Sequence, residues 1–364
     1  MKAKKLFVRN FRCFASKTLQ MDTDQIIIQG RNGAGKSTLL EALNYACYAH
    51  SFRTRKSEEL AKSGAKFFYI ELITEDNEGE SHKIQIGYDT TKRGTKAKSV
   101  KLNGKPARAT SEILRLFRTV SITSDDLELV KGSPEIRRNF LNQTLFLLNN
   151  EWNKTIRSFK KILSQRNALL WAGNPNRESL KTWTKQLWGK TVEIQLQRES
   201  ALCDIEFEAN RLLQEHFTDH NLSITLRYQR KKTVKGESFE DFWVQLCATG
   251  TTDREIILKR SSFGAHLDDF ETTIFARCAR TFASRGEQKL ITLLLKCSQL
   301  NVSNKAYKNR GILLLDDFLT DLDQQRLKQC IELLQSLKTQ IIITCPLDWN
   351  TLTKNEGNIQ TVKL

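Results

Sequence analysis

Residues 30–37 decide the fold of this chain, and they read Gly30-Arg31-Asn32-Gly33-Ala34-Gly35-Lys36-Ser37. The stretch matches the phosphate-binding pattern G-x-x-x-x-G-K-[ST], follows a short apolar strand at 25–28, and opens a helix. Glycines let backbone N–H groups converge on phosphate oxygens, and the N-terminus of the helix adds a favourable dipole. We therefore expect residues from Gly30 to Thr38 to hold ATP, with Lys36 at its β- and γ-phosphates and the Ser37 hydroxyl on Mg²⁺.

A second apolar strand ends in two carboxylates, in the sequence Ile312-Leu-Leu-Leu-Asp316-Asp317. A buried strand of this kind brings Asp316 to a Mg²⁺ ion beside Ser37, directly or through a water molecule. Asp317 is expected to point elsewhere and to polarise the attacking water. Asp317 and Lys36 are therefore the candidate catalytic residues of an ATPase.

The separation of these two motifs indicates the class of ATPase. Lys36 and Asp316 are 316 − 36 = 280 residues apart, whereas GTPases and kinases place the corresponding groups much closer. Between them, Ser284-Arg285-Gly286-Glu287 opens another helix, and a serine followed by glycine at a helix start is an anion-binding surface. In ABC-type ATPases this signature caps the γ-phosphate that a partner subunit holds. Ser284 and Gly286 are therefore expected to contact a nucleotide bound by a second copy of the chain.

The remaining pattern predicts an α/β fold, an ABC-type P-loop ATPase head with a β-rich N-terminal lobe and an inserted short helical arm. Alternating segments at 67–73 and 82–88, followed by the hairpin signal Asn103-Gly104, predict the β-rich lobe. Helical periodicity begins at Pro134 and predicts the arm. Further strands are expected at 222–228, 312–315 and 341–344. We divide the chain into residues 1–133 (first part of the head), 134–218 (helical arm) and 219–364 (second part of the head).

The composition excludes several classes of protein. The 364 residues are 39% hydrophobic and 27% charged, which is typical of a soluble globular protein. No stretch approaches the about 18 consecutive apolar residues of a membrane helix. The basic start lacks the apolar run of a signal peptide, so we expect a cytoplasmic protein with no membrane partner. The eight cysteines include no CxxC pair, which argues against a zinc site or a disulfide framework.

The charge balance favours a polyanionic partner. The chain has 58 Lys and Arg against 41 Asp and Glu, a net charge of +17 with a pI near 9.5. Such a field attracts nucleic acid first and an anionic membrane surface second, and phosphate contacts bind DNA without reading its sequence. The alternative for each basic cluster is a solvated face. The candidate DNA contacts are Arg53, Arg55, Lys56, Lys92, Arg93, Lys96, Lys98, Lys101, Arg157, Lys160 and Lys161.

Nearly the whole chain resembles the RecF family, bacterial recombination-mediator ATPases related to SMC head domains. The resemblance depends on the order and number of several runs rather than on any one of them. These runs are Val8–Arg12, Asn32–Ala42, Ser51–Arg55, Asp126–Leu141, Gly264–Asp269, Ala283–Gly286 and Leu315–Asp323. The last run includes Thr320-Asp-Leu-Asp323, which resembles the loop that faces the partner subunit. The chain departs from the family at Asn142, Ala265, Leu267 and Glu287, where Asp, Pro, Arg and Gln are usual.

The resemblance implies a homodimer that closes on ATP and binds double-stranded DNA at single-strand gaps. There, with RecO and RecR, such a protein helps to load the RecA recombinase during DNA repair and replication. Its ATP hydrolysis is implied to be weak, DNA-stimulated and used for release. Asp317 is shorter than the glutamate that most ABC enzymes use as base, and Thr344 stands where transporters place a histidine. Both features are consistent with slow turnover.

Other classes remain as alternatives. A transporter ATPase would be shorter, with its signature much nearer to Lys36 than the 284 − 36 = 248 residues found here. An SMC-like ATPase of DNA ends or chromosome structure would replace the arm by a very long coiled coil. An ABC–Toprim nuclease would need an additional acidic metal domain after residue 330. A DNA-binding module that does not hydrolyse ATP is the remaining alternative.

Overall fold

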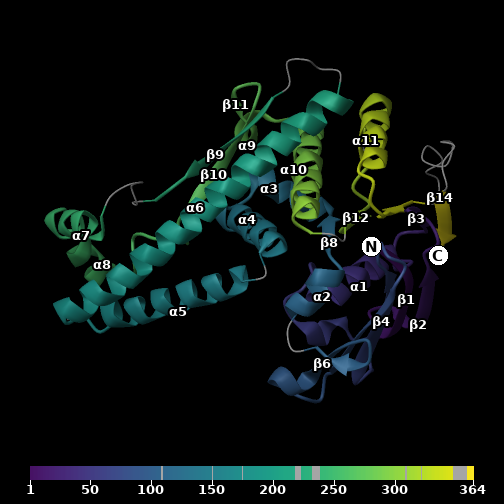
Figure 1. Cartoon of the computed structure of the whole chain (residues 1–364), viewed down its shortest axis with the longest axis horizontal. Coiled ribbons are helices and arrows are strands. Elements are labelled where there is room, and N and C mark those ends of the chain that lie inside the picture. The colour runs from purple at the N-terminus through teal and green to yellow at the C-terminus, as the bar shows by residue number, and fades with distance from the viewer. Residues whose placement is uncertain are drawn as a thin grey trace. The chain divides into compact units, whose positions relative to one another are not determined.

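The computed structural model describes residues 1–107, 110–149, 151–173, 175–217, 223–231, 238–307, 310–320, 322–346 and 359–364, with the backbone alone at residues 95, 110 and 111. The described residues form two compact units (Figure 1). The first unit comprises Met1–Leu127, Arg211–His220 and Arg285–Leu364, and the second comprises Glu128–Asn210 and Asn221–Ser284. No helix in the described part of the chain is both long and apolar enough to cross a membrane.

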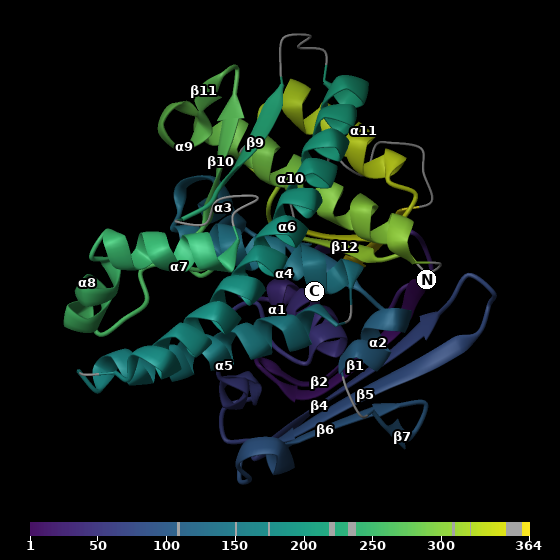
Figure 2. The same ribbon diagram turned by 60° about the vertical axis from the view of Figure 1, so that its left-hand side comes forward.

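The first unit contains an antiparallel sheet with the strand order β2-β1-β4-β5-β6-β7 (Figure 2). Every second side chain of β4 is buried, because successive side chains of a strand point to opposite faces. A turn at Asn103 and Gly104, both with positive φ, joins the last two strands as the sequence predicts. The strands are β1 (Lys2–Phe11), β2 (Phe14–Gln20), β4 (Phe67–Glu75), β5 (Ser81–Asp89), β6 (Lys98–Leu102) and β7 (Lys105–Pro106).

The second sheet of this unit is parallel, in the order β14-β3-β13-β12-β8. Its central strands are continuous apolar runs, as expected for strands buried on both faces. The predicted strands at 25–28, 312–315 and 341–344 are confirmed as β3, β12 and β13, whereas β14 was not expected. The strands are β3 (Gln25–Gln29), β8 (Thr119–Ile122), β12 (Ile312–Asp316), β13 (Ile341–Cys345) and β14 (Ile359–Lys363).

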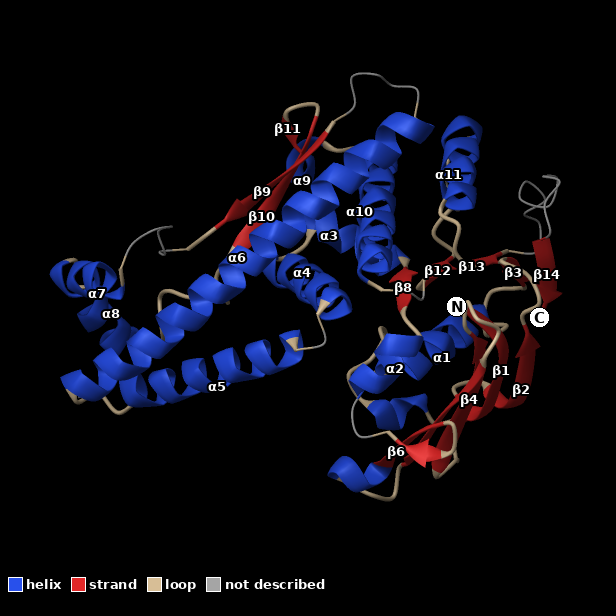
Figure 3. Ribbon diagram, viewed as in Figure 1, coloured by secondary structure: helices blue, strands red, loops and turns tan. Residues whose placement is uncertain are grey.

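Helix α1 (Lys36–Tyr48) packs against strands of both sheets and is buried along nearly its whole length. The two sheets therefore hold the helix that follows the phosphate-binding loop from both sides (Figure 3). The other helices of the unit are α2 (Thr110–Leu116), α10 (Arg285–Ala306) and α11 (Gln324–Ser336), with short 3₁₀ turns at η1 (Ser57–Leu60), η2 (Gly94–Ala97) and η3 (Ser124–Leu127).

The second unit is mainly helical, with a small antiparallel sheet in the order β11-β10-β9. Its apolar core joins side chains of the long helices to aromatic residues such as Phe242 and Phe263, whose rings meet edge to face with centroids 4.9 Å apart. Pro134 begins α4 as predicted. The elements are α3 (Glu128–Lys131), α4 (Pro134–Leu148), α5 (Trp152–Trp171), α6 (Arg177–His216, whose last turn belongs to the first unit), β9 (Ile224–Gln229), α7 (Phe239–Ala248), α8 (Thr251–Leu258), β10 (Asp269–Ile274), β11 (Arg277–Cys278) and α9 (Ala279–Phe282).

These compact units differ from the segments expected from the sequence mainly in residues 221–284. The expected division assigned this stretch to the second part of the head, but it clusters with the helices of the arm. Residues 128–133, expected in the head, also cluster with the arm, and residues 211–217, expected in the arm, cluster with the head. The physical reason is that β10 pairs with β9 and packs on α4, and that Arg137 on α4 forms an ion pair with Asp269 at 2.7 Å. The strand predicted at 222–228 is found as β9, and residue 222 lies outside the described residues.

Candidate functional site

The phosphate-binding loop joins β3 to α1, and its conformation requires glycine at position 35. Gly35 lies in the left-handed region at φ 97° and precedes the first residue of the helix. A Cβ atom at this position would lie 2.4 Å from the ring of Phe14 and 2.9 Å from Sγ of Cys13. The turn between β1 and β2 therefore packs directly on the loop and leaves no room for a side chain.

Lys36, Ser37 and Asp317 meet at one cavity of about 450 Å³ in the first unit. The Lys36 side chain is 4% exposed, and its Nζ donates a hydrogen bond to the Gly30 carbonyl at 3.0 Å. The same ammonium lies 3.7 Å from Oδ2 of Asp317. The cavity is lined by Arg12, Cys13, Asn32, Gly33, Gly35, Lys36, Ser37, Thr38, Arg53, Glu59, Ala61 and Asp317.

Ser37 and Asp316 come together although 279 residues separate them in sequence. The Ser37 hydroxyl donates to Oδ1 of Asp316 at 2.7 Å. Burial raises the pKa of Asp316, and the hydrogen bonds from Ser37 and Thr344 oppose this shift. Oxygen ligands of Mg²⁺ lie about 2.1 Å from the ion in octahedral geometry, so two adjacent ligand oxygens are roughly 3 Å apart. The two side chains therefore match a Mg²⁺ site in both chemistry and spacing.

Thr344 links the two acidic residues at the end of β12. It pairs with Asp316 in the parallel register of β12 and β13 and is 1% exposed. Its hydroxyl donates to Oδ1 of Asp316 at 2.9 Å and accepts the backbone N–H of Asp317 at 2.9 Å. Asp317 has a φ of 46°, a left-handed conformation that is uncommon for a residue other than glycine. Among the described residues, no hydrogen-bond partner reaches Oδ1 of Asp317, so this oxygen is available to a further group.

The buried carboxylate of Glu41 contacts two arginines, Arg12 and Arg53, that line the cavity. Its side chain is fully buried and accepts hydrogen bonds from Arg12 Nε at 3.0 Å and Arg12 Nη2 at 2.8 Å. The Ser51 hydroxyl also donates to Glu41, and Arg53 Nη1 lies 3.9 Å away. Sequence reasoning gave Arg12 and Glu41 no role. The available signal was a glutamate in the middle of the apolar run Leu39-Leu40-Glu41-Ala42-Leu43.

The signature occupies the start of α10. Ser284 directly precedes that helix, and Gly286 lies in its first turn with open space where a Cβ atom would be. In the following turn of the helix, Lys289 donates a hydrogen bond to the Thr320 carbonyl, which ties α10 to the loop after β12. Asp321 of that loop lies outside the described residues. The roles of Ser284 and Gly286 toward a partner's nucleotide stay predictions.

The run Gly264–Asp269 has a structural role within the second unit. Asp268 is fully buried, and its carboxylate accepts from Gln195 at 2.8 Å and from the Tyr228 hydroxyl at 2.9 Å. Burial raises the pKa of Asp268. His266 packs beside Phe159, and burial together with neighbouring arginines lowers the pKa of its imidazole to about 4. Positions 265 and 267, where the chain differs from the usual RecF sequence, therefore lie in a packed segment that supports the helical arm.

Several of the predicted DNA-contacting residues have structural partners instead. Lys98 donates to the Ala49 carbonyl and lies 5.3 Å above the Tyr45 ring, and burial lowers its pKa. Lys92 pairs with Asp89 at 3.1 Å. Arg53 lines the cavity at the phosphate-binding loop. Lys98 therefore has a structural role within the first unit.

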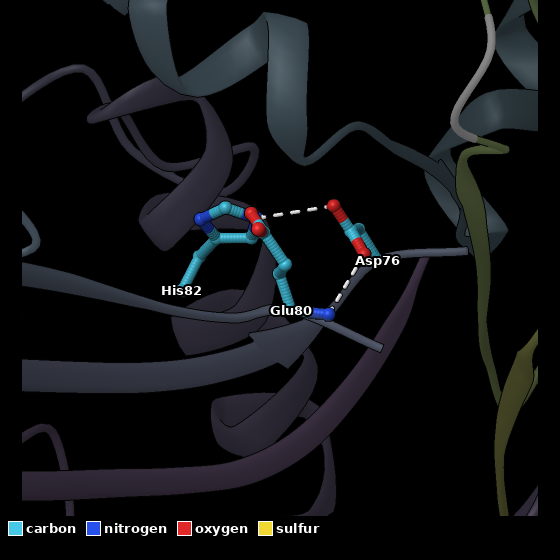
Figure 4. Close-up of side chains that lie close together, drawn as sticks. All are labelled: Asp76, Glu80 and His82. Atoms are coloured by element: carbon cyan, nitrogen blue, oxygen red, sulfur yellow. Dashed lines mark hydrogen bonds and ion pairs between the residues drawn. The ribbon is translucent and has the colours of Figure 1, made fainter. Parts of the chain in front are cut away.

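One other group of side chains has the ligand types of a metal site. Asp76, Glu80 and His82 place ligand atoms within 4.8 Å of one another at the turn between β4 and β5 (Figure 4). Oδ1 of Asn103 accepts from the Lys83 N–H at 2.8 Å, so its amide nitrogen faces Nδ1 of His82 at 3.4 Å. Nε2 of the same ring lies 3.4 Å from Oδ2 of Asp76, so the imidazole contacts a neighbour through each nitrogen. The group is a hydrogen-bonded turn.

The fold and the cavity together define the head of an ABC-type ATPase. A model of the RecF/RecN/SMC N terminal domain family matches residues 2–363, so the chain belongs to this family, and its similar curated proteins are RecF proteins. The DNA replication and repair protein RecF of Desulforamulus reducens is 33% identical over 360 residues, covering 94% of this chain and 92% of that protein. The protein of the same name from Clostridium novyi is 29% identical over 349 residues, covering 96% and 94%.

Solved structures agree with this assignment. A structure of the recombination mediator protein RecF with ATP in the RecFOR pathway has a TM-score of 0.83 and 27% identity, covering 96% of this chain and 93% of that one. An SMC head bound to the C-winged helix domain of ScpA has a TM-score of 0.57 at 15% identity and shares the fold alone. The predicted fold class, an ABC-type head with a β-rich lobe and a helical arm, is confirmed.

Proposed function

We propose that this protein is a slow ATPase that closes as a homodimer on ATP and binds DNA. The observation that carries the proposal is that Lys36, Ser37 and Asp317 line one cavity. The Ser37 hydroxyl is in turn hydrogen-bonded to Asp316 at 2.7 Å. Lys36 would bind the β- and γ-phosphates, and the rest of the loop would surround the nucleotide through Gly30, Arg31, Asn32, Gly33, Ala34, Gly35 and Thr38. The ATP named for the similar RecF structure supports the choice of nucleotide.

Ser37 and Asp316 would hold Mg²⁺, which when bound neutralises charge on the phosphate oxygens. Asp317 would accept a proton from the attacking water through the oxygen that has no partner among the described residues. Its backbone is held by Thr344, so the carboxylate has a defined direction. An aspartate is one methylene shorter than the usual glutamate, and we infer that water activation is correspondingly weak and turnover slow.

The signature residues Ser284 and Gly286 would cap the γ-phosphate held by a second copy of the chain. The open space around Gly286 supports this role, because a partner's phosphate can approach the backbone there. We further infer that the dimer binds double-stranded DNA at single-strand gaps in the cytoplasm. In that setting it would act with RecR and RecO upstream of RecA, as the RecFOR pathway named for the similar structure suggests.

The experiment that tests this function measures the mass of the protein by light scattering without nucleotide, with ADP and with ATP, each with and without gapped DNA. We expect a monomer without nucleotide, a dimer with ATP and Mg²⁺, and a DNA complex whose lifetime ends with hydrolysis. An ATP-independent mass would contradict the closing dimer. A protein that binds DNA but never turns over ATP would instead be a DNA-binding module of the same fold.

A further inference from the structure

Helix α5 of the second unit has an unusual charge composition. Its 20 residues include Lys154, Arg157, Lys160, Lys161 and Arg166, and they include no Asp or Glu. The whole chain, in contrast, has 41 acidic residues against 58 basic ones. A helix of this length with positive charge alone has no internal ion pairs between side chains one turn apart, which are the usual partners of surface lysines.

The basic side chains are separated from the packed face of the helix. The buried residues of α5 are Trp152, Phe159, Ile162, Arg166 and Leu170, which share one face at helical spacing. Arg166 belongs to that face, where it is fully buried and pairs with Glu255 at 2.5 Å. Arg157, Lys160 and Lys161 are exposed. At 100° per residue, Arg157 and Lys161 point directly away from the core, and Lys160 lies at the edge of the exposed face.

These three residues also lack local partners. Among the residues that the structure describes, no carboxylate lies within 4.0 Å of Arg157, Lys160 or Lys161. Lys154, one turn earlier, is different, because Glu151 holds it at 2.6 Å. Among the basic candidates of the first unit, Lys92 is paired with Asp89 and Lys56 with Glu59.

The helix is firmly held, so its charges have fixed positions. Helices α5 and α6 lie side by side (Figure 3). Thr155 donates to Glu193 of α6 at 3.1 Å, and Arg166 donates to Thr184 of α6 at 3.0 Å. The exposed face ends at Trp171, whose side chain is 69% exposed and lies under the Lys259 ammonium at 4.8 Å. A firmly held helix face whose exposed cations have fixed positions is suited to a polyanion with regularly spaced phosphates.

We propose that the exposed face of α5, with Arg157, Lys160 and Lys161, is a contact surface for the sugar–phosphate backbone of duplex DNA. The inference rests on the DNA binding proposed above and assigns it to particular residues. A helix of 20 residues is about 30 Å long, comparable to roughly nine base pairs at 3.4 Å each. The three side chains span little more than one helical turn, so they would contact up to three neighbouring phosphates without reading the sequence.

The test measures binding of a fluorescent duplex to the full-length protein with ATP and Mg²⁺, at salt concentrations from low to physiological. The variant Arg157→Glu/Lys160→Glu/Lys161→Glu is compared with Lys66→Glu/Lys328→Glu/Lys338→Glu, three exposed lysines of the first unit. Both variants change the net charge equally. We expect the α5 variant to lose about tenfold or more in affinity and its log–log salt slope to weaken by up to about 2.7, at 0.9 per phosphate. The first-unit variant should retain most of the wild-type affinity and slope.

Two further variants make the outcome decisive. Arg157→Lys/Lys160→Arg/Lys161→Arg keeps every charge and should bind DNA like the wild type. If the charge-reversal variant has a lowered melting temperature, the neutral variant Arg157→Gln/Lys160→Gln/Lys161→Gln replaces it in the binding measurement. If the α5 variants bind DNA with the affinity and slope of the first-unit variant, this surface is not the DNA contact, and an acidic partner protein becomes the better occupant. A wild-type protein that binds no duplex at any salt concentration would instead overturn the proposed DNA binding and this surface with it.

Discussion

The Thr344 hydroxyl bridges the acidic pair, with its oxygen 2.9 Å from Oδ1 of Asp316 and 2.9 Å from the backbone nitrogen of Asp317. Thr344→Val keeps the shape of the side chain but removes both hydrogen bonds. A hydrogen bond to a charged group contributes about 1.5–3 kcal/mol. Each increase of about 1.4 kcal/mol in the activation free energy slows a reaction tenfold. We expect ATP hydrolysis to fall roughly tenfold or more while nucleotide affinity changes little.

The matched control for this prediction is Thr344→Ser, which retains the hydroxyl and should restore most of the turnover. Single-turnover hydrolysis and fluorescent ATP binding measure the two quantities separately. Equal rates for the valine and serine variants would show that the hydroxyl does not position Asp316 and Asp317.

Asp317→Asn should separate nucleotide binding from hydrolysis. The amide is nearly the same size but cannot take a proton, and general acid–base catalysis commonly contributes about 10²–10⁴ in rate. The change also removes the negative partner of Lys36 at 3.7 Å, so ATP affinity should be kept or increased. We expect an ATP-bound dimer that persists on DNA, observed by light scattering. Native turnover in this variant would exclude Asp317 as the base.

Glu41→Gln tests whether the buried carboxylate positions Arg12 at the cavity. The substitution removes a charge that is fully buried and hydrogen-bonded to Arg12 and Ser51, which should lower the free energy of unfolding by about 1–3 kcal/mol. Nucleotide affinity should fall as well, because Arg12 then loses its charged partner and keeps only the hydrogen bond to the Glu59 carbonyl at 3.2 Å. Glu59→Gln is the control, since Glu59 lines the same cavity but is half exposed. Thermal melts and ATP titrations that cannot distinguish the two variants would refute the positioning role.

Ser284→Arg tests the proposed contact with a partner's nucleotide. A bulky cation at the start of α10 should leave the variant's own phosphate-binding loop unchanged, so the monomer should bind ATP normally. Dimerisation, hydrolysis and stable DNA binding should be lost. Mixing this variant with Lys36→Ala should restore at most one composite site. If Ser284 only caps its own helix, Ser284→Arg would cost about 1 kcal/mol of stability and sedimentation with ATP would show a normal dimer.

The motifs that could be predicted from the sequence are those in which local chemistry restricts the residue types. The glycine at position 35 and the strand ending in Asp316 have few alternatives, and both lie where expected. The pairing of Arg12 with Glu41 could not be predicted, because it depends on how β1 and α1 meet. Strand β14 (Ile359–Lys363) was not predicted because it is short and because it pairs with β3, which lies near the other end of the chain.

The grouping of residues 221–284 with the helical arm was missed for a similar reason. The alternation along β9 correctly predicts a strand but carries no information about which sheet receives it. Asp268 and Asp269 are adjacent carboxylates in the sequence, yet one is fully buried and the other pairs with Arg137. Long-range ion pairs of this kind have no periodicity, so a single sequence does not reveal them.

The close packing of the β1–β2 turn on Gly35 provides a natural chemical reporter of nucleotide occupancy. Cys13 is exposed and lines the cavity, whereas Cys47, Cys297, Cys330 and Cys345 are buried. A thiol-reactive dye therefore meets Cys13 in the empty protein, and a bound triphosphate should shield it. The other exposed thiol, Cys203 on α6, provides an internal reference in the same molecule. The ratio of labelling at the two positions would measure how many subunits of a mixed dimer hold nucleotide, without any engineered probe.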